Sequence, residues 1–201
     1  MNFRYKINIT TVLPVVMFIS ASKRMKTQCV VFCMRLLYNK YGDIMTKIMF
    51  ICHGNICRSP MAEFIFRDLA NKMGVGDNFY ASSSATSTEE IWNGVGNPVY
   101  PPAKAELKKH GILCDGKRAV QLKKSDYDNY DLLVCMDSQN VRNALRILGS
   151  DTENKVYKLM NFTARGGDVA DPWYSGNFEA AYNDIFEGCT ALIQKLTGEN
   201  R

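Results

Sequence analysis

Apolar and polar residues begin to follow a regular pattern at Lys47. Residues 47–52 form a short apolar run that ends at a loop containing glycine and asparagine, as a buried strand does at the edge of a sheet. An apolar residue then recurs at every fourth position, as in a helix: Met61, Ile65, Leu69 and Met73. The pattern predicts a strand, a loop and a helix, with Ser59 as the helix N-cap and Pro60 at the first helical position.

Strands and helices keep alternating further along the chain. Strands are predicted at 79–82, 131–136 and 155–159, and helices at 102–110, after an N-cap at Ser138, and after Asn177. The continuous apolar centre of 131–136 fits a parallel strand that is covered on both faces. We therefore expect one α/β domain, a doubly wound four-stranded parallel sheet with helices on both faces.

Charge separates the first 44 residues from the rest of the chain. Residues 1–44 hold seven basic residues and one acid, Asp43, whereas the remainder is close to neutral, with 18 basic and 19 acidic residues. The apolar run at 12–19 is far shorter than the roughly 20 residues that span a bilayer. We expect 1–44 to be an N-terminal extension, poorly attached or a start-site artefact with Met45 as the natural start, and 45–201 to be the functional domain. A targeting segment is the alternative for 1–44.

The near-neutral body and the cysteines limit the classes of function. Without a basic stripe, nucleic-acid binding has no support, and no membrane partner is expected. Seven cysteines are an odd number in a chain too long to need disulfides, which favours a reducing compartment and a cytoplasmic location. Two histidines and no pair of Cys-x2-Cys motifs argue against zinc, so the sequence predicts no metal and no cofactor.

The loop after the first strand carries the strongest chemical signal, because ligands bind beyond the carboxyl ends of parallel strands. Five residues separate Cys52 from Arg58, enough for backbone N–H groups to curl around a tetrahedral anion beside the positive end of a helix. Gly54 and Asn55 tolerate the left-handed backbone that this requires. The same field favours a thiolate at Cys52, a nucleophile, and the planar fork of Arg58 suits two phosphate oxygens. We therefore expect a phosphate-binding loop here.

Residues 51–60, Ile-Cys-His-Gly-Asn-Ile-Cys-Arg-Ser-Pro, resemble the signature of the low-molecular-weight protein tyrosine phosphatase family, Cys-x5-Arg-Ser-Pro. The resemblance runs from about Lys47 to Leu196. It includes Cys135-Met136-Asp137 after the third strand and Asp171-Pro172-Trp173-Tyr174 before the last helix. It implies a metal-independent hydrolase that cleaves phosphotyrosine through a phosphocysteine on Cys52.

The resemblance also implies roles for individual residues. Asp171 is expected to be the general acid, and a carboxylic acid on a loop suits that chemistry. The expected substrate and phosphate contacts come from the loop and from three aromatic walls: His53, Gly54, Asn55, Ile56, Cys57, Ser59, Trp92, Trp173 and Tyr174. Ser83 and His110 are expected to join Asn55 and Ser59 in a supporting hydrogen-bond network. Cys57 could condense with oxidised Cys52, which would make the enzyme redox-sensitive, or it could be a simple packing residue.

Three other functions were weighed against this one. An arsenate reductase of the same fold needs a further cysteine pair, and Cys114 and Cys135 are far apart in sequence. A protein arginine phosphatase is the closer rival, but Ile56, Trp173 and Tyr174 favour tyrosine. A silent phosphate-binding module would be expected to have lost one of the three catalytic candidates. The expected partner is a phosphotyrosine protein, with a tyrosine kinase as one candidate, and the expected state is a monomer or weak dimer.

Overall fold

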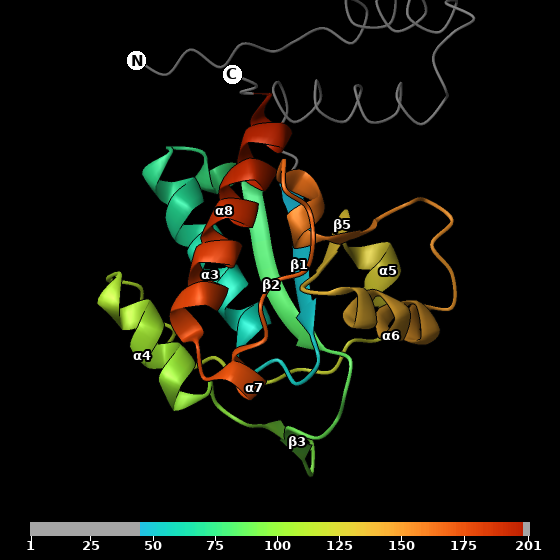
Figure 1. Cartoon of the computed structure of the whole chain (residues 1–201). Helices are drawn as coiled ribbons and strands as arrows, with labels where there is room; N and C mark the ends of the chain where they lie inside the picture. Colours follow the sequence, from blue (N-terminus) through green and yellow to red (C-terminus); the bar gives the residue numbers. More distant parts are fainter. Residues whose placement is uncertain (1–44, 199–201) are drawn as a thin grey trace, which may run out of the picture. The chain divides into compact units, whose positions relative to one another are not determined.

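Four parallel strands form the central sheet of the computed structural model, which describes residues 45–198 (Figure 1). Their order is β2-β1-β5-β6, with β1 at Thr46–Cys52, β2 at Phe79–Ala85, β5 at Leu132–Cys135 and β6 at Val156–Lys158. The predicted fold class is confirmed. The predicted extension at 1–44 lies outside the described residues and stays a prediction.

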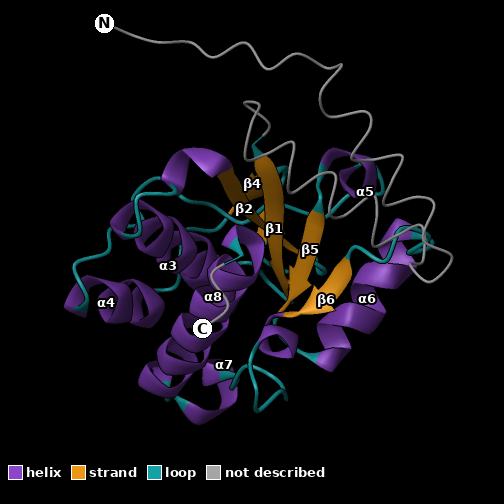
Figure 2. Cartoon of the chain, turned by 90° about the horizontal axis from the view of Figure 1, so that it is seen from above, coloured by secondary structure: helices purple, strands orange, loops and turns teal. Residues whose placement is uncertain are grey.

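Helices cover both faces of the sheet (Figure 2). One face carries α3 (Arg58–Lys72) and α8 (Phe178–Thr197), with α4 (Pro101–Lys109) packed against both. The other face carries α6 (Ser138–Leu148) and the short α5 (Asp126–Asn129). A hairpin of β3 (Ile91–Trp92) and β4 (Val95–Gly96) and a single turn, α7 (Pro172–Ser175), complete the elements used below.

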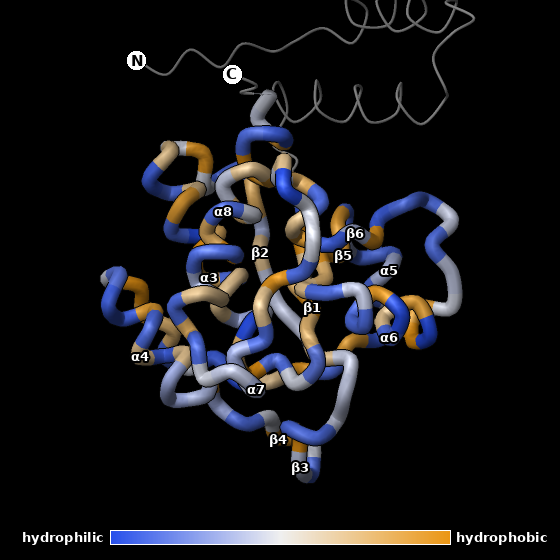
Figure 3. Tube along the Cα trace, viewed as in Figure 1, coloured by the Kyte–Doolittle hydropathy of each residue, from blue (hydrophilic) through white to orange (hydrophobic). Residues whose placement is uncertain are grey.

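Alternate residues of β1 enter two separate cores, because successive side chains of a strand point to opposite faces. Ile48, Phe50 and Cys52 belong to the larger core under α3 and α8, whereas Met49 and Ile51 belong to the smaller core under α6. Figure 3 shows hydrophobic residues concentrated along these central strands and hydrophilic ones in the surrounding loops. The last side chain of β1, Cys52, therefore lies at the sheet edge on the α3 side.

Two predicted helix starts need correction. The N-cap of α3 is Cys57 rather than Ser59, and Ser59 lies inside the first turn with its hydroxyl directed to other partners. The N-cap of α6 is Asp137 rather than Ser138, because the Asp137 carboxylate accepts a hydrogen bond from the N–H of Asn140. The predicted N-cap region of α8 is correct, since the Asn177 side chain accepts from the N–H of Ala180. Aspartate and asparagine satisfy free helix amides as serine does.

The carboxyl end of β1 lies where the order of strands reverses. From β1 the chain crosses to β2 on one side, and it later returns to β5 on the other side of β1. A crevice forms at such a reversal in open α/β sheets, and ligands bind there. Figure 1 shows α7 and the β3 hairpin at the same end of the sheet.

Candidate active site

The loop from Cys52 to Ser59 joins the end of β1 to the first turn of α3 and curls around the sulfur of Cys52. The N–H of Asn55 donates a hydrogen bond to Cys52 Sγ at 3.3 Å, and Ser59 Oγ lies 3.0 Å from the same sulfur. Asn55 has φ +57°, the left-handed conformation that asparagine tolerates better than most residues. The curl predicted from the sequence is therefore present, with the buried sulfur at its start.

Neighbouring segments clamp the backbone of this loop. The N–H of Ser87 donates to the carbonyl of His53, and the N–H of Tyr100 donates to the carbonyl of Ile56, both at 2.9 Å. A Cβ on Gly54 would lie 3.0 Å from Cγ of Glu90, so any larger residue would push against this side chain. The loop is thus held on one side by residues 86–90 and on the other by the start of α4.

Arg58 is buried and lies between two carboxylates. Its NH1 donates to Oδ2 of Asp137 at 2.7 Å, and its NH2 donates to Oδ2 of Asp171 at 2.6 Å. Burial alone would lower the pKa of Arg58, but the negative charges of Cys52, Asp171 and Asp137 outweigh it and raise the pKa above its usual value. Arg58 therefore stays a cation and joins the ends of β1 and β5 to the start of α7.

A hydrogen-bond network supports the loop from behind. The side-chain amide of Asn55 is oriented by the N–H of Val120, which donates to its Oδ1 at 3.0 Å. Its Nδ2 then donates to both Ser59 Oγ and Ser83 Oγ, each at 2.8 Å, and Ser83 Oγ donates to Oε2 of Glu63 at 2.6 Å. The direction of each hydrogen bond in this network is defined, because a backbone N–H donates at one end and a carboxylate accepts at the other.

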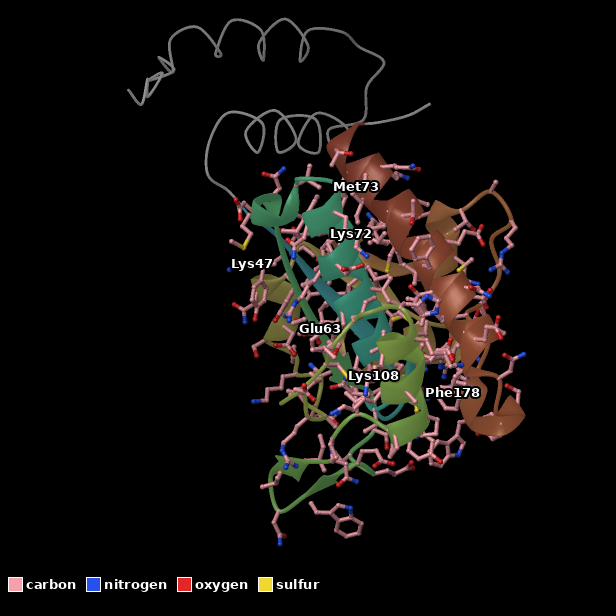
Figure 4. All side chains as sticks on the ribbon, turned by 90° about the vertical axis from the view of Figure 1, so that its left-hand side faces the viewer. Lys47, Glu63, Lys72, Met73, Lys108 and Phe178 are labelled. Carbon is pink, nitrogen blue, oxygen red and sulfur yellow. The ribbon has the colours of Figure 1, made fainter. Side chains whose placement is uncertain are left out.

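Glu63 is the charged end of the network. It projects from α3 inside the packed domain and is only 3% exposed (Figure 4). Its carboxylate pairs with Lys117 and with Arg67, both at 2.8 Å. A buried carboxylate needs such partners to offset its lost hydration.

This network also orients the hydroxyl of Ser59, which lies beside the Cys52 sulfur. Because Ser59 Oγ accepts from Asn55, its own hydrogen is free for another acceptor. Cys52 Sγ at 3.0 Å is nearer than the Ser84 carbonyl at 3.4 Å. The Ser59 hydroxyl can donate to either acceptor, and donation to Cys52 Sγ is the arrangement that stabilises a thiolate.

Comparisons with known proteins agree with this geometry. A family model described as "Low molecular weight phosphotyrosine protein phosphatase" matches residues 47–201. The chain belongs to that family. The phosphatase YfkJ of Bacillus subtilis is 35% identical over 159 residues, which are 78% of this chain and 99% of that protein. The pig low molecular weight phosphotyrosine protein phosphatase is 36% identical over 160 residues, which are 77% of this chain and 98% of that protein. The crystal structure of YfkJ matches with a TM-score of 0.72 and 34% identity, covering 78% of this chain and 98% of the other. The crystal structure of a Streptococcus pyogenes low molecular weight protein tyrosine phosphatase matches with a TM-score of 0.67 and 34% identity, covering 76% of this chain and 93% of the other.

The structure brings most of the expected site residues of this phosphatase domain together, but His110 lies elsewhere. His110 follows the end of α4 and stacks on Tyr182 of α8 with ring centroids 3.6 Å apart, and its Nε2 lies 3.5 Å from Oε1 of Glu106. The predicted place of His110 in the supporting network was wrong, because α4 directs it toward α8. Glu63 and Lys117 lie at the end of the network instead, and neither was predicted from the sequence.

The three aromatic residues predicted to flank the substrate are all exposed, and their role as walls stays a prediction. Trp173 and Tyr174 belong to α7, directly after Asp171, and are 57% and 88% exposed. The Trp173 ring packs 5.4 Å from that of Tyr100. Trp92, 71% exposed, stands on the β3 hairpin, whose turn at 93–94 has positive φ at both residues, as type I′ hairpins require.

Cys57 is the second cysteine of the loop and is buried. Burial, together with the negative charges of Cys52 and Asp171, raises the pKa of Cys57 to about 12, even though Arg58 opposes the shift. Cys57 is therefore a thiol at neutral pH and does not compete as a nucleophile. Among residues 45–198, no group of three or more His, Cys, Asp or Glu side chains is placed to hold a metal ion.

Replacing Lys117 tests the ionic end of the network. Lys117→Met leaves the buried Glu63 with fewer partners, and we expect it to lower the free energy of unfolding by about 3 kcal/mol and to reduce turnover. Lys104→Met is the matched control, because Lys104 pairs with Asp115 at an exposed site, and its loss should leave the free energy of unfolding nearly unchanged. Urea unfolding measures both, and equal midpoints for the two variants would contradict the role given to Lys117.

Proposed function

We propose that this chain is a protein-tyrosine-phosphatase that hydrolyses phosphotyrosine and aryl phosphate monoesters through a phosphocysteine on Cys52. The observation that carries the proposal is the convergence at one strand end of the Cys52 sulfur, the Arg58 guanidinium and the Asp171 carboxylate. A nucleophile, a phosphate-binding cation and a proton donor are the parts that this reaction needs. Family membership supports the same reaction.

The reaction proceeds in two displacements. The Cys52 thiolate attacks phosphorus, the bond from phosphorus to the tyrosine oxygen breaks, and Asp171 gives its proton to that oxygen. In the second step Asp171, now a carboxylate, takes a proton from water, and the resulting hydroxide attacks phosphorus. The P–S bond breaks, phosphate leaves, and the thiolate and the protonated Asp171 are restored.

Arg58 has to change partners when substrate binds. Its NH2 is bonded to Asp171 in this structure, where a phosphate oxygen could also bind. A dianionic phosphate would displace the carboxylate from Arg58, and its added negative charge would favour a proton on Asp171. Substrate binding would thus release the acid and prepare it for proton transfer in one event.

The exposed aromatic side chains support tyrosine rather than arginine as the phosphorylated residue of the substrate. Trp92, Trp173 and Tyr174 offer large flat surfaces near the loop, and aromatic rings pack favourably in offset or edge-to-face geometry. Ile56, in the loop itself, is buried and packs with Cys57 and Ala119 rather than presenting a polar group. A protein arginine phosphatase is the second candidate that the test below addresses.

Phosphoproteins are the substrates that family membership implies, and a tyrosine kinase is one candidate among them. We place the protein in the cytoplasm, because the cysteines of the described region are free thiols. Within residues 45–198, no helix is both long and apolar enough to cross a bilayer. A monomer or weak dimer stays a prediction.

Cys52→Ser is expected to abolish metal-free turnover of 4-nitrophenyl phosphate, because a serine hydroxyl is not ionised at neutral pH. The wild type should hydrolyse phosphotyrosine peptides with a higher kcat/KM than phosphoarginine peptides, measured by phosphate release. A preference for phosphoarginine would move the assignment to the arginine phosphatases, and full activity of Cys52→Ser would exclude the covalent mechanism.

Asp171→Ala is expected to lower kcat/KM by about 10²-fold or more for phenyl phosphate, whose leaving group is poor, and much less for 4-nitrophenyl phosphate. Only the poor leaving group needs a proton as the bond to phosphorus breaks. A series of aryl phosphates measures the dependence on leaving-group pKa. Equal losses across the series would argue against Asp171 as the acid.

Because Asp171 and phosphate compete for Arg58, removal of the Asp171 carboxylate should also strengthen phosphate binding. In the inactive Cys52→Ser protein, Asp171→Ala should bind inorganic phosphate about tenfold more tightly, which corresponds to about 1.4 kcal/mol. Calorimetric titration measures this, with Glu187→Gln, an exposed carboxylate on α8, as the control. Unchanged phosphate affinity in Asp171→Ala would show that the ion pair does not oppose substrate binding.

A further inference from the structure

Residues 168–170, which lead to Asp171, each form hydrogen bonds with a different part of the domain. Asp168 accepts hydrogen bonds from Lys158 and from Ser138. The N–H of Val169 donates to the carbonyl of Met136 at 2.9 Å. Two glycines with positive φ, Gly166 and Gly167, precede these anchors, so the chain turns just before them through a conformation that glycine adopts without strain.

Asp184 of α8 provides the next anchor and holds the segment at two places. Its Oδ2 accepts from the N–H of Ala170, the residue immediately before Asp171, at 2.9 Å. Its Oδ1 accepts from Arg165 at the start of the segment, and the Nε of Arg165 also donates to Glu187 one turn further along α8. The Asp184 side chain is 18% exposed, so water weakens these bonds less than at an open surface.

We infer that Asp184 is a positioning residue for the general acid Asp171. The inference rests on the proposed function, because it assigns Asp184 a part in the proton transfer by Asp171.

Asp171 has to turn its side chain without moving its backbone. When phosphate takes over Arg58, the carboxylate loses its bond to that residue, and only its bond from the N–H of Trp173, at 3.0 Å, remains on the α7 side. The bond from Ala170 to Asp184 fixes the backbone on the other side. A displacement of about 1 Å in a catalytic group can cost about 10²-fold in rate, so this backbone anchor matters for proton transfer.

The experiment compares Asp184→Ala with Asp184→Asn across the aryl phosphate series. We expect Asp184→Ala to lower kcat/KM by about tenfold for phenyl phosphate and by less than twofold for 4-nitrophenyl phosphate, a part of the full effect of general acid catalysis. Asp184→Asn keeps an oxygen that can accept from Ala170 and should recover most of the loss. Glu187→Gln is the matched control, because it removes only the negative charge from the outer contact with Arg165 and should behave as wild type.

A double-mutant cycle separates positioning from a general structural effect. In the Asp171→Ala background, Asp184→Ala should cause no further loss for phenyl phosphate, because the acid that it positions is already absent. Additive losses, or equal losses for good and poor leaving groups, would overturn the inference while leaving the proposed function intact. If Asp171→Ala itself shows no dependence on the leaving group, the acid assignment fails, and the inference fails with it. Asp184→Ser, whose hydroxyl is too short for both bonds, repeats the comparison if Asp184→Ala does not fold.

Discussion

A single buried guanidinium constrains the architecture of this phosphatase. Arg58 is 4% exposed, and a buried cation is costly unless oppositely charged groups surround it. Those groups come from Asp137 after β5 and from Asp171 before α7, in addition to Cys52 at the end of β1. The requirement to neutralise one side chain therefore brings three distant parts of the sequence to the same sheet edge.

A second buried charge stabilises the opposite side of the loop. Glu63 and Lys117 end a hydrogen-bond chain that passes through Ser83 and Asn55, and no member of this chain has a choice of direction. The main effect of the network is to orient the side chains of Ser83 and Asn55. A buried ion pair adds little to the net free energy of folding, but it fixes which atoms donate hydrogen bonds. Arg58 interacts with Cys52 through its charge, whereas the network that ends at Glu63 reaches the Cys52 sulfur through Asn55 and Ser59.

Local pattern was enough to predict the four strands of the central sheet, the four longer helices and the phosphate loop, but not the hairpin of β3 and β4 or the short helices α5 and α7. The apolar period of α8 and the buried run of β5 are visible in the local sequence, and so is the spacing of Cys52 and Arg58 that marks the loop. Helix starts were less certain, because an aspartate and a serine that are adjacent in sequence, as at 137–138, are both good N-caps. Only the hydrogen bond to Asn140 distinguishes them.

The supporting network could not be predicted in the same way. Glu63 reads as an ordinary surface residue of a helix, and Lys117 as part of a polar turn, because their pairing depends on how residues 111–122 return past β2. The role of His110 had been carried over from the family resemblance alone, and the direction in which α4 packs places this side chain against Tyr182 of α8 instead. A glutamate between the buried residues Met61 and Phe66 was the one available signal, and it becomes meaningful only with a partner in space.

Packing and chemistry are linked through α8. This helix buries Ile185, Cys189 and Leu192 against the sheet, so its position is set by the hydrophobic core. The same helix carries Asp184 one residue before Ile185, and the core therefore fixes where the anchor for Ala170 lies. Because Asp171 follows Ala170 directly, the position of its carboxylate depends on core packing as well as on its own ion pair with Arg58. A loop residue can thus be held accurately when the residues on both sides of it are tied to rigid elements.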